Sequence, residues 1–137
     1  GVGYPEEIKL VANCRRRNIF TAAYAYTPDE VRAMAQAGAD LISAHVGATS
    51  GGTCGFEQAY SMDETCERTE KMFEAAMQEN PDIIFTCHGG PLEDPKAVQE
   101  CFRRTGVHGF VGASSIERIP VEKTIRDTVL EFKSLKR

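Results

Sequence analysis

The stretches DLISAHV, residues 40–46, and DIIFTCH, residues 82–88, decide the fold. Each is nearly continuous in apolar residues, with no regular alternation of polar ones, and this pattern indicates a strand that is buried within a sheet. Two further runs have the same character, IFTAAYAY at residues 19–26 and GFVGA at residues 109–113. We therefore expect four strands in this chain.

Helical patterns lie around and between these strands. The helix predicted after the first strand begins at Thr27, which can form a capping box with Glu30, and has Pro28 in its first turn and Gly38 as its stop. Further helices are expected from Pro5 to Arg17, from Ser61 to Asn80, from Asp94, and from Pro120 with an apolar stripe of Val121, Ile125, Val129 and Phe132. The predicted order is α(βα)₄.

This alternation predicts parallel strands joined by right-handed crossovers, with all carboxyl ends on one face. Four parallel strands leave two edges unpaired, and an eight-stranded barrel takes about 250 residues against 137 here. We therefore predict that residues 1–137 form a single α/β domain, the C-terminal half of a (β/α)₈ TIM barrel. A compact flavodoxin-like open sheet is the structural alternative. The side chains expected on the inner face are those of Phe20, Ile42, Ile84 and Phe110.

Composition excludes several classes of protein. The net charge of -4 and pI of about 5.4 come from intermingled acids and bases, so nucleic acid is not an expected partner. The apolar runs are too short for a membrane span, and no signal pattern opens the chain, which predicts a soluble cytoplasmic protein without a membrane partner. The five cysteines include no CxxC pair and are expected to be free thiols.

Each predicted strand ends with a small residue followed by a polar one. The four pairs are Ala25-Tyr26, Ala44-His45, Cys87-His88 and Ala113-Ser114. The carboxyl ends of parallel strands surround one mouth, where ligands of such folds bind. We therefore expect the four polar residues to face one pocket, with His45 and His88 as candidate acid/base catalysts. A lone histidine is more often structural, but two at equivalent strand ends favour a function.

The loop that follows His45 is rich in glycine and hydroxyl residues. Its backbone amides and side chains are candidate ligands for an anion, although it lacks the lysine of a Walker loop, and a flexible barrel loop is the alternative. The candidate binding residues in it are Gly47, Thr49, Ser50, Gly51 and Gly52.

Two later loops supply further candidates for binding phosphate, because the loops after the last two strands often do so in TIM barrels. They contain Gly89 and Gly90, and Gly112, Ser114 and Ser115; a tight turn and a helix cap are the alternatives. Glu117 and Arg118 form either a local surface pair or a carboxylate-binding or phosphate-binding site. We expect His108, at the opposite end of the sheet, to be structural. No carboxylate pair is evident at the mouth, so no metal ligand is assigned.

Four segments together resemble the phosphoenolpyruvate-hydrolase-like TIM-barrel family, whose members are also called TIM-barrel signal-transduction or IGPS-like domains. The segments are Ala37–Asp40, His45–Gly52, Cys87–Pro91 and Val107–Arg118, and the resemblance extends over essentially the whole chain. It implies a TIM barrel that is distantly similar to phosphonopyruvate hydrolases and other phosphoenolpyruvate-type enzymes. Those relatives use a divalent metal held by acidic residues, and no matching acidic motif occurs here. A metal would therefore need ligands from the other half of the barrel, and no other cofactor is assigned.

Two functions follow as hypotheses. The first is a hydrolase or lyase that acts on a small phospho- or carboxylate-bearing substrate of the phosphoenolpyruvate or phosphonopyruvate type, with His45 or His88 as acid/base. The second is a non-catalytic module that senses a small anionic metabolite or binds a protein through the same mouth. Because both sheet edges are open, we also expect the chain to form a homo-oligomer or to pair with an N-terminal half-barrel.

Overall fold

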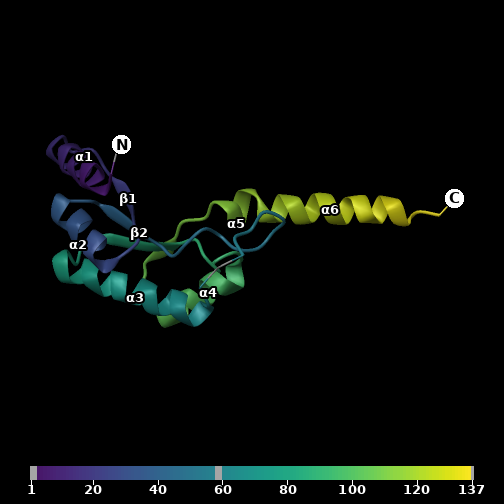
Figure 1. Cartoon of the computed structure of the whole chain (residues 1–137). Helices are drawn as coiled ribbons and strands as arrows, with labels where there is room; N and C mark the ends of the chain where they lie inside the picture. Colours follow the sequence, from purple (N-terminus) through teal and green to yellow (C-terminus); the bar gives the residue numbers. More distant parts are fainter. Residues whose placement is uncertain (1–2, 58–59, 137) are drawn as a thin grey trace.

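The computed structural model describes residues 3–57 and 60–136, and its elements follow the predicted order with one short helix added. The helices are α1 Tyr4–Arg16, α2 Pro28–Ala37, α3 Met62–Glu79, α4 Pro95–Arg104, α5 Ser114–Glu117 and α6 Ile119–Ser134; the strands are β1 Ala22–Ala25, β2 Leu41–His45, β3 Ile84–His88 and β4 Gly109–Phe110. The added helix, α5, directly precedes α6 (Figure 1).

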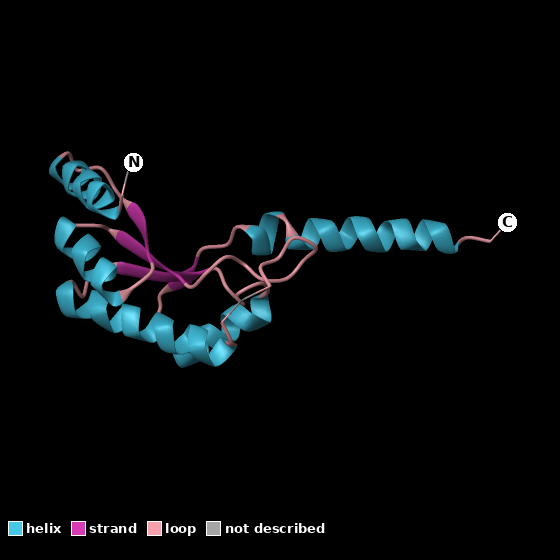
Figure 2. Cartoon of the chain, in the orientation of Figure 1, coloured by secondary structure: helices cyan, strands magenta, loops and turns pink. Residues whose placement is uncertain are grey.

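The strands form one parallel sheet in the order β1-β2-β3-β4. A flavodoxin-like sheet has the strand order 2-1-3-4-5 and helices on both faces. Here the strands follow chain order, and α2, α3 and α4 lie along one side of the sheet (Figure 2). The open-sheet alternative is therefore wrong.

The core lies between the sheet and these helices. The strand residues on that face, such as Ile42, Phe85 and Cys87, are fully buried against helix residues that include Met34 and Met72. Because side chains alternate along a strand, the neighbouring residues point to the other, inner face.

The inner face differs from the expectation in two respects. Phe20 and Ile84 are exposed there, as expected, but Ile42 is fully buried on the helix side. Phe110 is also on the helix side, where it packs against the core. The sequence does not show which residues face the helices, because both faces of each strand carry apolar residues.

The fourth strand is shorter than expected: it covers Gly109–Phe110, while the prediction extended to Ala113. Its neighbour β3 ends at His88, and the backbone bond from the Val111 amide to the Cys87 carbonyl, 3.0 Å, is the last between them. Beyond Val111 the chain has no strand to pair with and turns into α5.

The helix starts follow the predicted chemistry. Thr27 accepts a hydrogen bond from the Glu30 amide, and Ser61 and Glu64 form a complete capping box. Gly38 ends α2 with φ of 89°, a left-handed conformation that glycine adopts readily.

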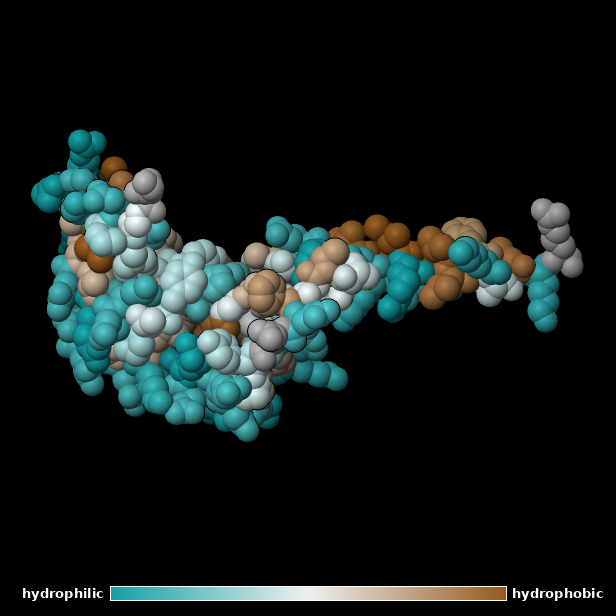
Figure 3. Space-filling view, viewed as in Figure 1, coloured by the Kyte–Doolittle hydropathy of each residue, from teal (hydrophilic) through white to brown (hydrophobic). Residues whose placement is uncertain are grey.

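Helix α6 forms as predicted, but it extends away from the rest of the molecule (Figure 1). Its apolar stripe is therefore exposed and appears as brown residues along the helix in Figure 3. No helix in the described residues combines the length and apolar character needed to cross a membrane.

The assignment of faces can be tested with two alanine substitutions. Ile42→Ala should lower the free energy of unfolding by about 2–5 kcal/mol, because it leaves a cavity in the core. Ile84→Ala, at a side chain that is 44% exposed, should cost well under half of that loss. Urea denaturation of the two variants of this chain measures the difference. Equal losses would contradict the assignment.

Candidate functional site

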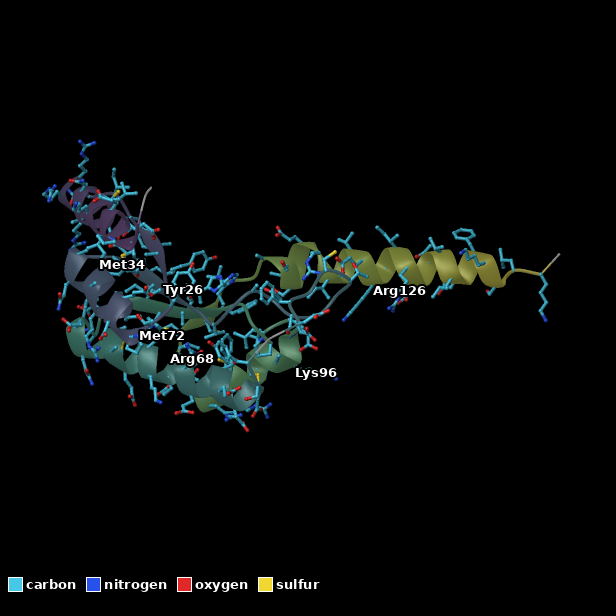
Figure 4. The ribbon with its side chains drawn as sticks, in the orientation of Figure 1. Tyr26, Met34, Arg68, Met72, Lys96 and Arg126 are labelled. Atoms are coloured by element: carbon cyan, nitrogen blue, oxygen red, sulfur yellow. The ribbon has the colours of Figure 1, made fainter. Side chains whose placement is uncertain are left out.

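Four aromatic rings gather on the inner face at the carboxyl ends of β1, β2 and β3. The centroids of the His45 and His88 rings are 4.9 Å apart, and these two residues are register partners in the sheet. Tyr26, labelled in Figure 4, packs on His45 at 4.9 Å, and Tyr24 lies 5.3 Å from His45 and 5.0 Å from His88. The structure thus brings together three of the four predicted mouth residues.

His88 is buried and held by a strong hydrogen bond. Its Nδ1 lies 2.7 Å from the Val111 carbonyl oxygen, just beyond β4. A carbonyl oxygen can only accept, so Nδ1 carries the proton. In the neutral ring Nε2 is then an unprotonated acceptor, which is the form that a general base requires.

His45 has the opposite arrangement. The Gly47 amide donates to its Nδ1 at 3.3 Å, so the neutral ring carries its proton on Nε2. Burial, with a smaller contribution from neighbouring His88, lowers the pKa of His45 below its ordinary value. The site therefore pairs an imidazole that can accept a proton with one that can donate a hydrogen bond.

Tyr24 is a site residue that the sequence reading missed. It precedes Tyr26 by two residues, and that spacing places both side chains on the same face of the strand. Its carbonyl accepts a hydrogen bond from the Tyr4 hydroxyl of α1 at 3.2 Å. The opening helix therefore supports the strand that carries the two tyrosines.

The glycine-rich loop is joined to the turn after β3 by backbone hydrogen bonds. The Gly90 amide donates to the Gly47 carbonyl at 2.8 Å, and the Ser50 amide donates to the Gly90 carbonyl at 2.9 Å. A Cβ at Gly89 would lie 2.1 Å from the Gly47 carbonyl oxygen, so this close approach requires glycine. These contacts fix the loop beside His45.

Two carboxylates that the sequence reading missed lie against the loop. The Thr53 amide donates to Glu122 at 2.7 Å, and this bond lowers the pKa of the Glu122 carboxyl. The Ser50 hydroxyl lies 3.4 Å from a carboxylate oxygen of Glu93. Cβ atoms at Gly51 and Gly52 would collide with the Glu93 and Glu122 carboxylates respectively. Protein carboxylates thus occupy part of the space that was predicted for a bound anion.

Arg118 pairs with a different residue from the one expected. Its guanidinium lies 3.2 Å from the Glu122 carboxylate and donates to the Gly51 carbonyl at 3.2 Å. Among the described residues Glu117 forms no ion pair with Arg118, so the surface-pair alternative for these two residues is wrong. In a helix, a residue four positions further on lies on the same side, and this spacing was the available signal for Glu122. Arg118 and Glu122 join the glycine-rich loop to α6.

Not every candidate binding residue of the loop after β4 lies beside the histidines. Ser115 lines an apolar groove against α4, on the helix-covered side of the sheet. Ser114 begins α5, and a Cβ at Gly112 would collide with the Ile116 side chain. Thr49 accepts a long backbone hydrogen bond from Phe56 within the first loop.

His108 and Cys87 lie where a role in the fold suits them better than a role in catalysis. His108 accepts a hydrogen bond from the Phe85 amide at 3.0 Å, at the end of the sheet away from the mouth. A hydrogen bond with Cys101, together with burial, raises the pKa of the Cys87 thiol far above its usual range, which does not suit a nucleophile. The five cysteines are free. Among the described residues, no group of three or more histidines, cysteines and acids is arranged to hold a metal ion.

Comparison with known sequences gives one family and several relatives. The family model described as phosphoenolpyruvate hydrolase-like matches residues 1–135. The chain is 45% identical over 136 residues to the ToMV susceptible protein tm-1(GCR26) of Solanum lycopersicum, and it covers 18% of that protein. It is 29% identical to y4pA of Sinorhizobium fredii, which is assigned as a transcriptional regulatory protein, and covers 22% of it. In both comparisons 98% of this chain is matched.

Solved structures show the same fold at low sequence identity. A protein from Burkholderia cenocepacia that is assigned as a phosphonomutase superposes with a TM-score of 0.58 and 10% identity, over 98% of this chain and 79% of that one. FabK from Thermotoga maritima gives a TM-score of 0.56 at 19% identity, over 85% of this chain and 32% of that one. These neighbours are TIM-barrel proteins, and the four-stranded parallel sheet is consistent with half of such a barrel.

The environment of His45 predicts its titration. The titration midpoint of His45 should lie below pH 6.5. The neutral His45 ring therefore contributes fully to the stability of the fold above pH 6.5, and this contribution decreases as the pH falls below that value. His88→Gln should raise the midpoint yet leave it below 6.5, because burial is the larger cause. NMR of the imidazole signals measures both values. The control His108→Gln should leave the His45 midpoint unchanged, and a wild-type midpoint above 6.5 would contradict the description.

The pairing of Arg118 can be tested by hydrogen exchange. Glu122→Gln should make the Thr53 amide exchange several-fold faster, because an amide oxygen is a weaker acceptor than a carboxylate and pairs poorly with Arg118. Glu117→Gln is the matched control and should leave Thr53 exchange unchanged. If both variants behave alike, the Glu122 contact does not hold the loop.

Proposed function

We propose, from the premise that this chain belongs to the phosphoenolpyruvate hydrolase-like family, that it contributes the acid/base half of a TIM-barrel active site. The reaction is hydrolysis or cleavage of a small phospho- or carboxylate-bearing substrate of the phosphoenolpyruvate or phosphonopyruvate type. The observation that carries the proposal is the pair of oppositely held imidazoles at the ends of β2 and β3. The chain spans about a fifth of the length of the curated relatives, so the activity of the whole protein is part of the proposal.

The two histidines have different roles in this proposal. His88 keeps Nδ1–H on the Val111 carbonyl and uses Nε2 to take a proton from water or from the substrate. His45 keeps Nδ1 on the Gly47 amide and uses Nε2–H to donate to the oxygen on which negative charge develops. The lowered pKa of His45 keeps that ring neutral near pH 7, so its Nε2–H acts as a hydrogen-bond donor beside His88.

Substrate contacts come from the rings and from groups that the loops leave available. Tyr24 and Tyr26 flank the imidazoles and restrict their movement. Among the described residues, the Thr49 and Ser114 hydroxyls make no side-chain hydrogen bond, so they remain candidates for the substrate anion. The Gly47 amide is already used by His45 and the Gly90 amide by the Gly47 carbonyl. Arg118 already binds Glu122 and Gly51. Further positive charge for the anion has to come from the part of the barrel that faces this half.

A divalent metal does not fit the described residues. Hard cations such as Mg²⁺ prefer several oxygen ligands, whereas the residues that gather at the mouth are two imidazoles and two phenols. The Glu93 carboxylate accepts a hydrogen bond from Ser50, and the Glu122 carboxylate is bound by the Thr53 amide and by Arg118. The proposed chemistry therefore includes no step on a metal held by this half.

A non-catalytic role is the second candidate. The carboxylates on the glycine-rich loop favour it, because they occupy places that a phosphate-binding loop would leave open. The Sinorhizobium fredii relative is named as a transcriptional regulatory protein, and this name also supports a non-catalytic role. In that case the mouth binds a metabolite, and no product forms.

Turnover distinguishes the two functions. The natural full-length protein is incubated with phosphoenolpyruvate or phosphonopyruvate, and ³¹P NMR follows loss of the substrate. His88→Gln and His45→Gln should each lower kcat by about 10²–10⁴-fold, with the Kd from calorimetry changed less than threefold. His108→Gln, at the other end of the sheet, should stay within twofold of the wild type. Binding without turnover would support the sensor, and unchanged turnover in His88→Gln would refute the assigned roles.

A further inference from the structure

Three of the five cysteines meet on the helix side of the sheet. Cys66 lies on α3, Cys87 on β3 and Cys101 on α4, and all three are buried. The Cys101 thiol is hydrogen-bonded to both of the others. A single buried cysteine acts as a small apolar side chain, whereas three thiols in contact, from three separate elements, can also react with one another.

The cluster concentrates thiolate character on Cys101. Its hydrogen bond with Cys87, and further ones with Thr105 and Cys66, lower the pKa of the Cys101 thiol although burial opposes this, and the Arg104 guanidinium adds to the effect. The Thr105 hydroxyl lies 3.7 Å from the Cys101 sulfur. The bond between Cys87 and Cys101 raises the pKa of the Cys87 thiol, so Cys87 keeps its proton. A thiolate beside a second thiol is the arrangement found at cysteines that peroxides oxidise selectively.

A route to Cys101 starts at the boundary between α3 and α4, which are in contact (Figure 1). A surface cavity of about 470 Å³ opens there, and Cys66 and Arg104 line it. Cys101 is hydrogen-bonded to Cys66 and lies in the last turn of α4. Helix ends open locally at a low cost in free energy, and hydrogen peroxide is little larger than water. The oxidant therefore reaches this sulfur without unfolding of the core.

We propose that Cys101 is a site of reversible oxidation by hydrogen peroxide and that Cys87 is its disulfide partner. The Cys101 thiolate attacks the peroxide, so an S–O bond forms and the O–O bond breaks; the leaving hydroxide becomes water with the proton that Cys101 had released. The sulfenic acid no longer carries the charge that held the proton on Cys87. The Cys87 sulfur then attacks the Cys101 sulfur, an S–S bond forms, the S–O bond breaks, and hydroxide leaves with the Cys87 proton as water. Two thiols and one peroxide thus give one disulfide and two waters.

The positions of the two neighbours favour Cys87 over Cys66 as the partner. In a displacement at sulfur, the attacking and leaving atoms lie on opposite sides of the sulfur that is attacked. Cys66 lies on the cavity side of Cys101, where the hydroxide leaves, whereas Cys87 lies on the side of the sheet.

The disulfide would join α4 to β3 at the residue directly before His88. The Cys87 thiol donates to the Gly109 carbonyl of β4 at 3.6 Å, and oxidation removes this bond. His88 is held by the Val111 carbonyl just beyond β4. Oxidation should therefore disturb the imidazole and lower turnover reversibly. This consequence rests on the proposed function, whereas formation of the disulfide does not.

Peptide mapping by mass spectrometry tests the disulfide. The natural full-length protein is reduced and treated with hydrogen peroxide, and the remaining thiols are alkylated in denaturant. The expected product joins residues 87 and 101 in most chains, and dithiothreitol reverses it. A bond between Cys66 and Cys101, overoxidation of Cys101 without a disulfide, or no reaction at Cys101 would each overturn the proposal.

Substitutions separate the two roles. In Cys87→Ala, dimedone added with denaturant should trap Cys101 as a sulfenic acid, because no partner resolves it. In Cys101→Ala, Cys87 should stay reduced, because burial still raises its pKa. The control Cys54→Ala, at an exposed thiol, should leave the disulfide yield within twofold. Circular dichroism verifies the fold of each variant, and the mapping of the wild type does not depend on them.

Turnover provides the second readout. Peroxide should lower turnover at least tenfold in the wild type and less than twofold in Cys101→Ala. If the disulfide forms and turnover is unchanged, the link to His88 is wrong. If the reduced protein shows no turnover at all, the proposed function fails, and the mapped disulfide still decides whether Cys101 is an oxidation site.

Discussion

The parallel pairing of β2 with β3 is the constraint on which the rest of the structure depends. Its register opposes Ile42 to Phe85 on the helix side and His45 to His88 on the inner side. Because the side-chain period of a strand is two, a slip of one residue in either strand would move a core side chain to the inner face and an imidazole to the helix side. The hydrophobic core and the candidate site are therefore set by the same backbone hydrogen bonds.

The loops extend this pairing beyond the strand ends. Gly47 and Gly90 continue the contact between the two segments, and Gly89 permits a backbone approach that any side chain would block. Glu122 and Arg118 then attach the loop to the last helix. A chain of close backbone contacts thus runs from the imidazoles to the base of α6, and the direction of that helix is tied to the geometry of the mouth.

The sequence predicted those features that depend on local chemistry. Thr27 and Ser61 begin helices, Gly38 ends one, and the strand ends bring His45 and His88 together. It could not assign Ile42 and Phe110 to the helix side, because continuous apolar runs do not show which face is covered. It also missed Tyr24 and Glu122, whose significance depends on neighbours that are distant in the sequence.

The inner face itself indicates what must cover it. Directly below the two imidazoles, the Ser43 and Thr86 hydroxyls are buried and have no hydrogen-bond partner among the described residues. A buried polar group without a partner costs about 1–3 kcal/mol, while Tyr24 and Ile84 on the same face remain partly exposed. The facing half of the barrel therefore has to supply apolar cover for Tyr24 and Ile84. The segment that completes the site must also be one that stabilises this half, so binding at the mouth and folding of the sheet are thermodynamically linked.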